Sequence, residues 1–157
     1  MSDRNLLKLA FVGCGAIAHY HLNGIKEHVP EIKVTAAIDT AKENAELIAA
    51  ETGAKVYSSL EEGLVDGDFD AVDLMLPHDL HESAAVQSFE AGKHLLLEKP
   101  IAHTLEACDR IFAAAQKTDT VFMVAENSQY WPEIVKAQEM IKMGMIGEVI
   151  TARATYK

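Results

Sequence analysis

The chain alternates between short, almost wholly apolar runs and longer stretches in which apolar residues recur every three or four positions. Short runs that are apolar throughout predict strands buried on both faces of a sheet, and the three-to-four spacing predicts amphipathic helices. The predicted strands are residues 6–12, 33–38, 55–57, 71–76, 94–97 and 121–125. Helices are predicted between them, and strands alternating with helices of this length indicate right-handed βαβ units. The fold class is therefore α/β, a doubly wound parallel sheet.

Several residues mark where the predicted helices begin and end. The first helix covers 16–28 and is stopped by Pro30, and Gly53 closes the second. Ser58 or Ser59 can cap a brief helix that runs to residue 64, and another helix covers 80–91. The packed face of the helix capped by Thr104 is predicted to consist of Leu105, Cys108, Phe112 and Ala115.

The pattern changes after residue 126. Pro132 suits the first turn of a helix, and residues 147–156 alternate between apolar and polar positions, which predicts a half-exposed strand. A lone strand after a completed six-strand unit indicates that residues 127–157 begin a second domain, although the strand could pair at the edge of the first sheet. Its unpaired backbone would otherwise be exposed, so we expect it to pair with that edge or with a neighbouring chain, as in a homo-oligomer.

The composition of the chain excludes some classes of binding partner. Fourteen Lys and Arg oppose twenty-four Asp and Glu, for a net charge of −10. Without a basic stripe, such a surface repels nucleic acid and anionic membranes, so neither is expected as a partner. The N-terminus leads straight into a strand-like run rather than a secretory signal, and a cytoplasmic location is expected. Cys14 and Cys108 suggest no disulfide framework; Cys14 fits a turn that needs a small side chain better than it fits a reactive thiol.

A glycine turn follows the first predicted strand. The segment Gly13-Cys14-Gly15-Ala16-Ile17-Ala18 would present bare backbone N–H groups at the start of a helix, where a pyrophosphate binds. A β-carbon at Gly15 would block that approach, and the small Ala18 lets the helix lie close to the sheet. The predicted cofactor contacts in this turn are Gly13, Gly15, Ala16 and Ile17.

Asp39 ends the second predicted strand, 24 residues after Gly15. A carboxylate at this position accepts hydrogen bonds from an adenosine ribose and repels a 2′-phosphate. Thr40 follows instead of an arginine, which favours NAD over NADP, while Lys42 leaves NADP open. Asp39 could also cap the following helix.

The loop after the fourth strand should lie at the carboxyl edge of the sheet, beside the reactive end of a dinucleotide. We expect cofactor contacts here from Leu76, Pro77, His78 and His81. The two histidines are three residues apart and could also suggest a metal, but no third ligand stands at a helical or strand spacing, so no metal is expected. The remaining histidines form no constellation and are predicted to be surface residues or satisfied helix residues: His19, His21, His28, His94 and His103.

Glu98-Lys99-Pro100 ends the fifth predicted strand and carries the most chemistry. The Lys99 ammonium can hydrogen-bond a hydroxyl or carbonyl oxygen and shuttle or polarise its proton while hydride moves. Proline fixes the backbone, and Glu98 can hold the nicotinamide ribose or tune the lysine. Alone, the motif would be an ordinary strand exit with a surface ion pair. Combined with the glycine turn, it indicates a nicotinamide-dependent oxidoreductase.

These motifs resemble those of the glucose–fructose oxidoreductase / inositol dehydrogenase / rhizopine catabolism (Gfo/Idh/MocA) dehydrogenases. The resemblance covers essentially the whole chain and rests on the glycine turn, Asp39, residues 77–81, residues 91–94 leading into Glu98-Lys99-Pro100, Asn127, and Gly144 followed by Gly147-Glu148-Val149.

The resemblance implies a Rossmann domain over residues 1–126, followed by the start of an α/β domain with a large open sheet. It matches Lys99 to the family's catalytic lysine and puts Asn127 near the nicotinamide. Pro77 is followed here by His78, where the family often has asparagine. Family members continue through a second domain that shapes the substrate pocket and often supplies a histidine acid/base. This chain stops after what resembles that domain's first strand, so we expect it to hold NAD but to turn over poorly or not at all.

The function predicted from these features is that of an NAD(P)-binding oxidoreductase domain. The enzyme would move hydride between nicotinamide and a carbinol carbon of a sugar, polyol or related compound. One alternative is a non-catalytic module that senses NAD and uses the sheet for association. Another is an S-adenosylmethionine methyltransferase, against which Glu98-Lys99-Pro100 and Ala18 argue.

Overall fold

The computed structural model describes residues 6–155. It divides into two compact units, one ending at Ala125 and the other starting at Glu126. Within the described residues, no helix combines the length and the apolar character needed to cross a membrane.

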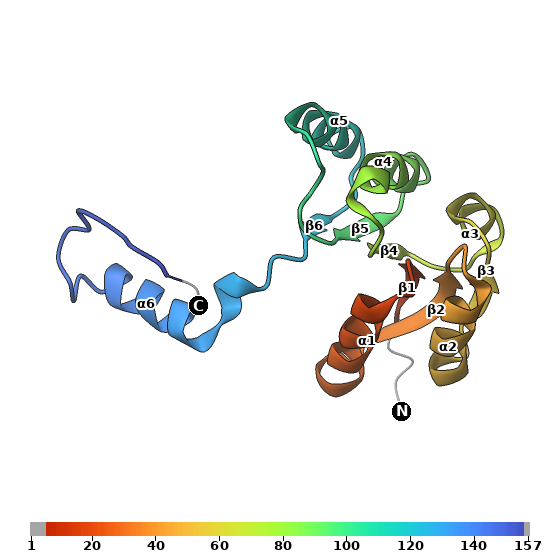
Figure 1. Ribbon diagram of the computed structural model, residues 1–157, viewed down its shortest axis with the longest axis horizontal. Coiled ribbons are helices and arrows are strands. Elements are labelled where there is room, and N and C mark those ends of the chain that lie inside the picture. The colour runs from red at the N-terminus through yellow and green to blue at the C-terminus, as the bar shows by residue number, and fades with distance from the viewer. Residues whose placement is uncertain (1–5, 156–157) are drawn as a thin grey trace. The chain divides into compact units, whose positions relative to one another are not determined.

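The first unit is built on a six-stranded parallel sheet, in the order β3-β2-β1-β4-β5-β6 (Figure 1). The predicted doubly wound parallel sheet is therefore confirmed. The strand order reverses between β1 and β4, and in such sheets ligands bind outside the carboxyl ends of the strands at that reversal. The strands are β1 (Leu7–Val12), β2 (Ile32–Ile38), β3 (Lys55–Tyr57), β4 (Ala71–Leu74), β5 (His94–Leu97) and β6 (Phe122–Val124).

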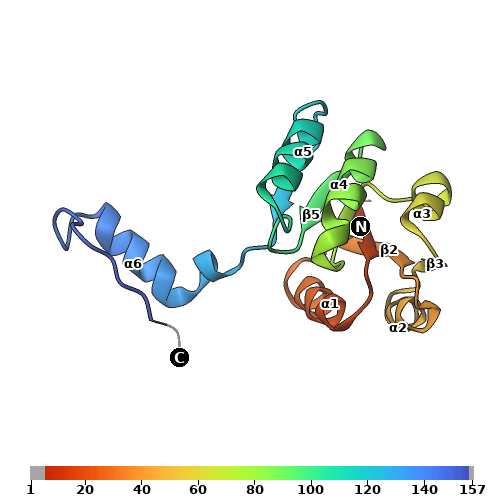
Figure 2. The same cartoon turned by 45° about the horizontal axis from the view of Figure 1, so that its top comes forward.

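Helices cover both faces of this sheet (Figures 1 and 2). Two helices, α1 and α2, share a buried cluster with one face, and α3, α4 and α5 share a second cluster with the other. The bounds are α1 (Ala16–His28), α2 (Lys42–Thr52), α3 (Leu60–Asp66), α4 (His81–Glu90) and α5 (Leu105–Ala115).

The strands divide their side chains between these two clusters. On β1, Phe11 packs towards α1 and α2, whereas Ala10 and Val12 pack towards the other helices. Successive residues of a strand point to opposite faces, so a strand covered on both faces is expected to be apolar at successive positions. This explains the apolar run of β1 from Leu9 to Val12, all of which are buried.

Local signals set several helix ends as predicted. Of the two candidate serines, Ser59 caps α3, since its side chain accepts a hydrogen bond from the Glu62 N–H at 3.2 Å. Thr104 caps α5 by accepting from the Ala107 N–H at 3.1 Å. Gly53 ends α2 in the left-handed conformation, with φ of 73°.

The predicted packed face of α5 is wrong for two of its four residues, Leu105 and Phe112. Leu105 is 80% exposed and Phe112 is 45% exposed, whereas Ala107 and Ile111 are fully buried. Residues four apart share one helix face, and α5 carries two apolar stripes. The stripe that contains Ala107 and Ile111 packs against the sheet. The fourth strand is also shorter than predicted, because it ends at Leu74 and the next two residues enter the loop.

The second unit holds the short helix η2 (Ser128–Tyr130) and α6 (Pro132–Lys142). Pro132 lies in the first turn of α6, as predicted. The strand predicted at 147–156 is not formed by residues 147–155, and Tyr156 lies outside the described residues. A strand needs a partner ladder for its backbone, and none of the strand pairings in the described chain includes this segment. Alternation alone therefore did not produce one.

Candidate functional site

The turn after β1 requires glycine at position 13. Gly13 has φ of +87°, a conformation that side chains rarely adopt, and a β-carbon there would overlap the carbonyl oxygen of Met75. The Gly13 N–H donates to the Ile38 carbonyl at 2.9 Å. The turn is therefore pressed against the carboxyl ends of both neighbouring strands, β2 and β4.

The space around the start of α1 is open. Gly15 is the N-cap of this helix, provides no side-chain cap, and has no heavy atom within 4 Å of where a β-carbon would stand. Ala16 and Ile17 follow it and are exposed. The first N–H groups of a helix have no partner within the helix, so this end can receive an anionic group.

Asp39 braces the same turn. One of its carboxylate oxygens accepts the Cys14 N–H at 2.8 Å, and the other accepts the Ala41 N–H at 2.8 Å. Asp39 thus links the glycine turn to the residue that precedes α2. It does not cap α2 at the usual position, because the N-cap of that helix is Ala41 itself, without a side-chain bond.

Predicted site residues from three strand ends line one hollow of about 160 Å³. Ile17 comes from the start of α1, Leu76 and His78 from the loop after β4, and Glu98 and Lys99 from the end of β5. Met75 completes the lining, and Pro77 lies exposed in the same loop. Lys99 therefore lies on the same rim of the sheet as the glycine turn.

His81 does not line this hollow. Its ring is fully buried at the start of α4, with Nδ1 3.0 Å from the Pro100 carbonyl oxygen and Nε2 2.9 Å from the Leu76 carbonyl oxygen. The predicted cofactor contact of His81 does not fit this placement, because both ring nitrogens are directed at backbone carbonyls. His81 instead ties the loop after β4 to the loop that follows Lys99.

His21 is predicted to be a surface or satisfied helix residue outside any constellation, and the structure corrects the second part of this prediction. Its Nδ1 lies 2.7 Å from Asp73 Oδ2 and its Nε2 lies 3.1 Å from Glu98 Oε1. The hydrogen bond to Asp73 holds the pKa of His21 above its ordinary value, and Glu98 adds to this effect. Burial raises the pKa of Asp73, which the histidine partly offsets. The sequence did hold a signal, since Asp73 is an acid inside an apolar strand and needs a partner.

Glu98 is engaged on both carboxylate oxygens. Oε1 faces His21, and Oε2 accepts the Lys99 N–H at 3.0 Å. Only 16% of its side-chain surface is exposed. Of the two roles predicted for Glu98, holding a ribose or tuning the lysine, these contacts favour an action on Lys99.

These features fit a nicotinamide dinucleotide. The glycine turn leaves bare backbone at an open helix start, and Asp39 stands at the end of the neighbouring strand. Lys99 lines the hollow next to Ile17, at the start of α1. Asn127, also predicted near the nicotinamide, belongs to the second unit, so its contact stays a prediction. Among residues 6–155, no group of three or more His, Cys, Asp or Glu side chains is arranged to hold a metal ion.

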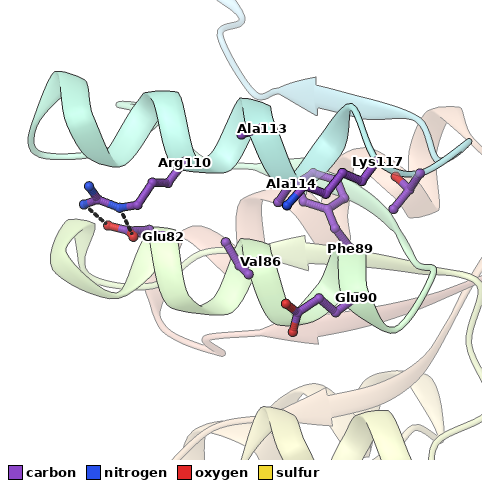
Figure 3. A pocket seen from close by; sticks show the side chains of 9 residues that line it. Glu82, Val86, Phe89, Glu90, Arg110, Ala113, Ala114 and Lys117 are labelled. Atoms are coloured by element: carbon purple, nitrogen blue, oxygen red, sulfur yellow. Dashed lines mark hydrogen bonds and ion pairs between the residues drawn. The ribbon is translucent and has the colours of Figure 1, made fainter.

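A larger hollow, of about 530 Å³, lies between α4 and α5 (Figure 3). Glu82 and Arg110 form an ion pair at one end of it, joined by two hydrogen bonds of 2.5 and 2.8 Å. Its floor is apolar and includes Val86 and Phe89. It shares no residue with the hollow at Lys99, and it contains none of the predicted site residues.

Comparison with known proteins supports the dinucleotide site. Residues 7–126 match the GFO_IDH_MocA oxidoreductase family, described as having an NAD-binding Rossmann fold. A levoglucosan dehydrogenase from Pseudarthrobacter phenanthrenivorans is 37% identical over 91 residues, which are 58% of this chain and 23% of that protein. A 4-carboxy-2-hydroxymuconate-6-semialdehyde dehydrogenase from Sphingobium sp. is 32% identical over 127 residues, 80% of this chain and 40% of that protein.

A solved structure shares the fold. The WlbA dehydrogenase from Bordetella pertussis, crystallised with NADH and UDP-GlcNAcA, superposes with a TM-score of 0.87 at 29% identity. The match covers 94% of this chain and 42% of that one. The chain thus spans less than half the length of each of these three relatives.

Proposed function

The chain belongs to the Gfo/Idh/MocA family of oxidoreductases, and on this premise we propose that it binds NAD and contributes Lys99 to hydride transfer at a hydroxyl-bearing carbon. The proposed substrate is a sugar, a polyol or a related hydroxy compound. The observation that carries the proposal is the hollow that Ile17, at the start of α1, shares with Lys99. It joins the end of a phosphate-binding turn to a cationic side chain at the neighbouring strand end.

The glycine turn would hold the pyrophosphate of the cofactor. Gly13 keeps the turn against β4, and Gly15 leaves the start of α1 open to an anion. Ala16 and Ile17 follow at the exposed start of that helix. The loop of Leu76, Pro77 and His78 would border the nicotinamide end, since it adjoins Lys99 in the hollow.

When bound, the nicotinamide ring supplies the two-electron hydride chemistry. Lys99 would act on the substrate oxygen. Its ammonium can donate a hydrogen bond to a hydroxyl or carbonyl oxygen and stabilise the negative charge that develops there. It can also give that oxygen a proton or take one from it, depending on the direction of the reaction.

We propose NAD rather than NADP as the preferred cofactor. Asp39 stands where a carboxylate would accept ribose hydroxyls and repel a 2′-phosphate. Lys42 is the nearby cation that could serve a phosphate, and its Nζ lies 2.9 Å from Glu46 Oε1 in an ion pair one turn along α2. The NADH in the related WlbA structure agrees with this preference.

The substrate class rests on the relatives. One is named as a levoglucosan dehydrogenase, and another is solved with UDP-GlcNAcA. We assign residues 127–157 to the start of the substrate-binding domain, because the family match ends at residue 126 and the relatives are more than twice as long as this chain's match to them.

Titration with NADH and NADPH, followed by nicotinamide fluorescence, tests the proposal. We expect saturable binding of NADH and weaker binding of NADPH. Lys99→Met should keep the NADH affinity within a few-fold while abolishing turnover of a polyol panel by an enzyme that includes the second domain. Lys117→Met, at the other hollow, is the matched control. Absence of nicotinamide binding would refute the cofactor assignment, and unchanged turnover would remove Lys99 from the mechanism.

A further inference from the structure

Four residues in successive contact form a line that connects the interior of the sheet to Lys99 of the Glu98-Lys99-Pro100 motif. Asp73, on β4, contacts His21 of α1, and His21 contacts Glu98, which follows β5. Glu98 in turn accepts the backbone N–H of Lys99. The contacts measure 2.7, 3.1 and 3.0 Å in that order.

The two ends of this line differ in exposure. Asp73 is 1% exposed, and its Oδ1 is buried with no hydrogen-bond partner among the described residues. Lys99 is exposed and lines the hollow of the proposed site. The line therefore runs from a fixed, buried anchor to the residue that would meet the substrate.

Two carboxylates face the His21 ring, and the charge of the ring depends on theirs. Where both carboxylates are ionised they only accept hydrogen bonds, so the ring between them then donates from both nitrogens and carries a positive charge. A neutral ring would turn a bare nitrogen towards one carboxylate. Among the described residues, the charged groups that contact the His21 ring are Asp73 from β4 and Glu98 from the end of β5.

We propose that His21 is a positioning residue: held by Asp73, its charged ring fixes Glu98, and Glu98 fixes the backbone of Lys99. The inference rests on the proposed function only in taking Lys99 as the residue that acts on substrate. Helix α1 would then have two roles: its start forms part of the glycine turn, and its His21 supports Lys99 through Glu98. A small displacement of a catalytic group is costly, with a shift of 1 Å reducing rates by about a hundredfold.

NMR of the chain tests this without requiring turnover. The Lys99 amide donates to a carboxylate, so its proton shift reports on the position and charge of Glu98. We expect this shift to titrate with pH at the midpoint of the His21 ring, measured from the ring nitrogen shifts in the same sample. In His21→Gln, the Lys99 titration should disappear.

His19→Gln is the matched control. His19 lies on the same helix, with its side chain 40% exposed and 3.8 Å from Glu51 Oε1. This variant should keep the Lys99 titration. A flat Lys99 amide in the wild-type chain, or a titration that survives in folded His21→Gln, would overturn the proposal. Should His21→Gln not fold, the wild-type titration alone decides.

NADH binding is measured on the same samples. Its absence in a wild-type chain whose Lys99 amide titrates with His21 would count against the proposed function and leave the positioning role intact. A Lys99 amide shift that does not change with pH, in a chain that binds NADH, would count against the positioning role and leave the proposed function intact. The two ideas therefore fail separately.

Discussion

Gly13 lies directly against Met75: a β-carbon on Gly13 would occupy the space of the Met75 carbonyl oxygen. This contact joins the turn after β1 to the end of β4, the two strands between which the sheet order reverses. Gly15, two residues on, has nothing within 4 Å of an added β-carbon. The two glycines therefore differ: Gly13 is required by the packing of the turn, whereas Gly15 leaves open space, which we propose is for the ligand.

The first prediction separates the two glycines. Gly13→Ala should lower the free energy of unfolding by about 2 kcal/mol or more, because a positive φ alone costs a side chain about 1–2 kcal/mol and the clash adds to it. Gly15→Ala should change stability by less than about 1 kcal/mol yet weaken NADH binding at least tenfold. Urea unfolding and NADH titration of both variants measure this. Equal stability losses in the two variants would contradict the assignment.

The second prediction concerns pH. The pKa of His21 is raised in the folded chain, so its contribution to stability is complete below the unfolded pKa of about 6.5 and is lost as the pH rises through the folded value. Asp73 has the same sign, but its loss of stability begins at a lower pH: its raised pKa means that stability falls as the pH rises above the unfolded carboxyl value of about 3.9. The free energy of unfolding should therefore fall as the pH rises above about 6.5.

Urea unfolding between about pH 5.5 and 9, on either side of the histidine range, measures this dependence. His21→Gln should flatten the curve above about pH 6.5, whereas His19→Gln should follow the wild-type chain. A wild-type curve that rises over this range would show that the His21 pKa is not raised.

The third prediction distinguishes two histidines of one loop. His81→Ala should destabilise the chain by about 2–4 kcal/mol, because it leaves a cavity in place of a buried ring and removes the contacts to the carbonyls of Leu76 and Pro100. His78→Ala should cost less than about 0.5 kcal/mol, since His78 is exposed. Thermal and urea unfolding of the pair provide the test. If His81→Ala were as stable as His78→Ala, the link between the two loops would be dispensable.

The fourth prediction concerns the cysteines. Burial, with a contribution from Asp39, raises the pKa of the Cys14 thiol to about 12. At pH 8 only about one Cys14 in ten thousand would then be a thiolate, the reactive form. Iodoacetamide should label the half-buried Cys108 first, and both should react in urea. Mass spectrometry of tryptic peptides reads out the order, and fast labelling of native Cys14 would refute the burial argument.

Much of the fold of the first unit could be predicted, because the sequence patterns that set it are local. Continuous apolar runs, the glycine turn and the caps at Ser59 and Thr104 depend on neighbours in the sequence. The placement of Lys99 on the rim of the glycine turn also follows, since all strands of a parallel sheet end on one edge.

The wrong predictions concern features that depend on residues far away in the sequence. Which of the two apolar stripes of α5 is buried depends on how the helix packs on the sheet. Residues 147–155 have an alternating pattern but no partner strand among the described residues. His21 was overlooked because its two carboxylates are 52 and 77 residues away. Asp73 could have been recognised as needing a cation, but only the three-dimensional structure shows which residue supplies it.

Asp39 limits how the cofactor preference of this chain could be re-engineered. Asp39, which we propose disfavours NADP, is also the acceptor for the amides of Cys14 and Ala41. A change to a small or basic residue would remove both of these hydrogen bonds along with the proposed barrier to a phosphate. A successful redesign must therefore supply another acceptor for these amides before it adds a positive charge.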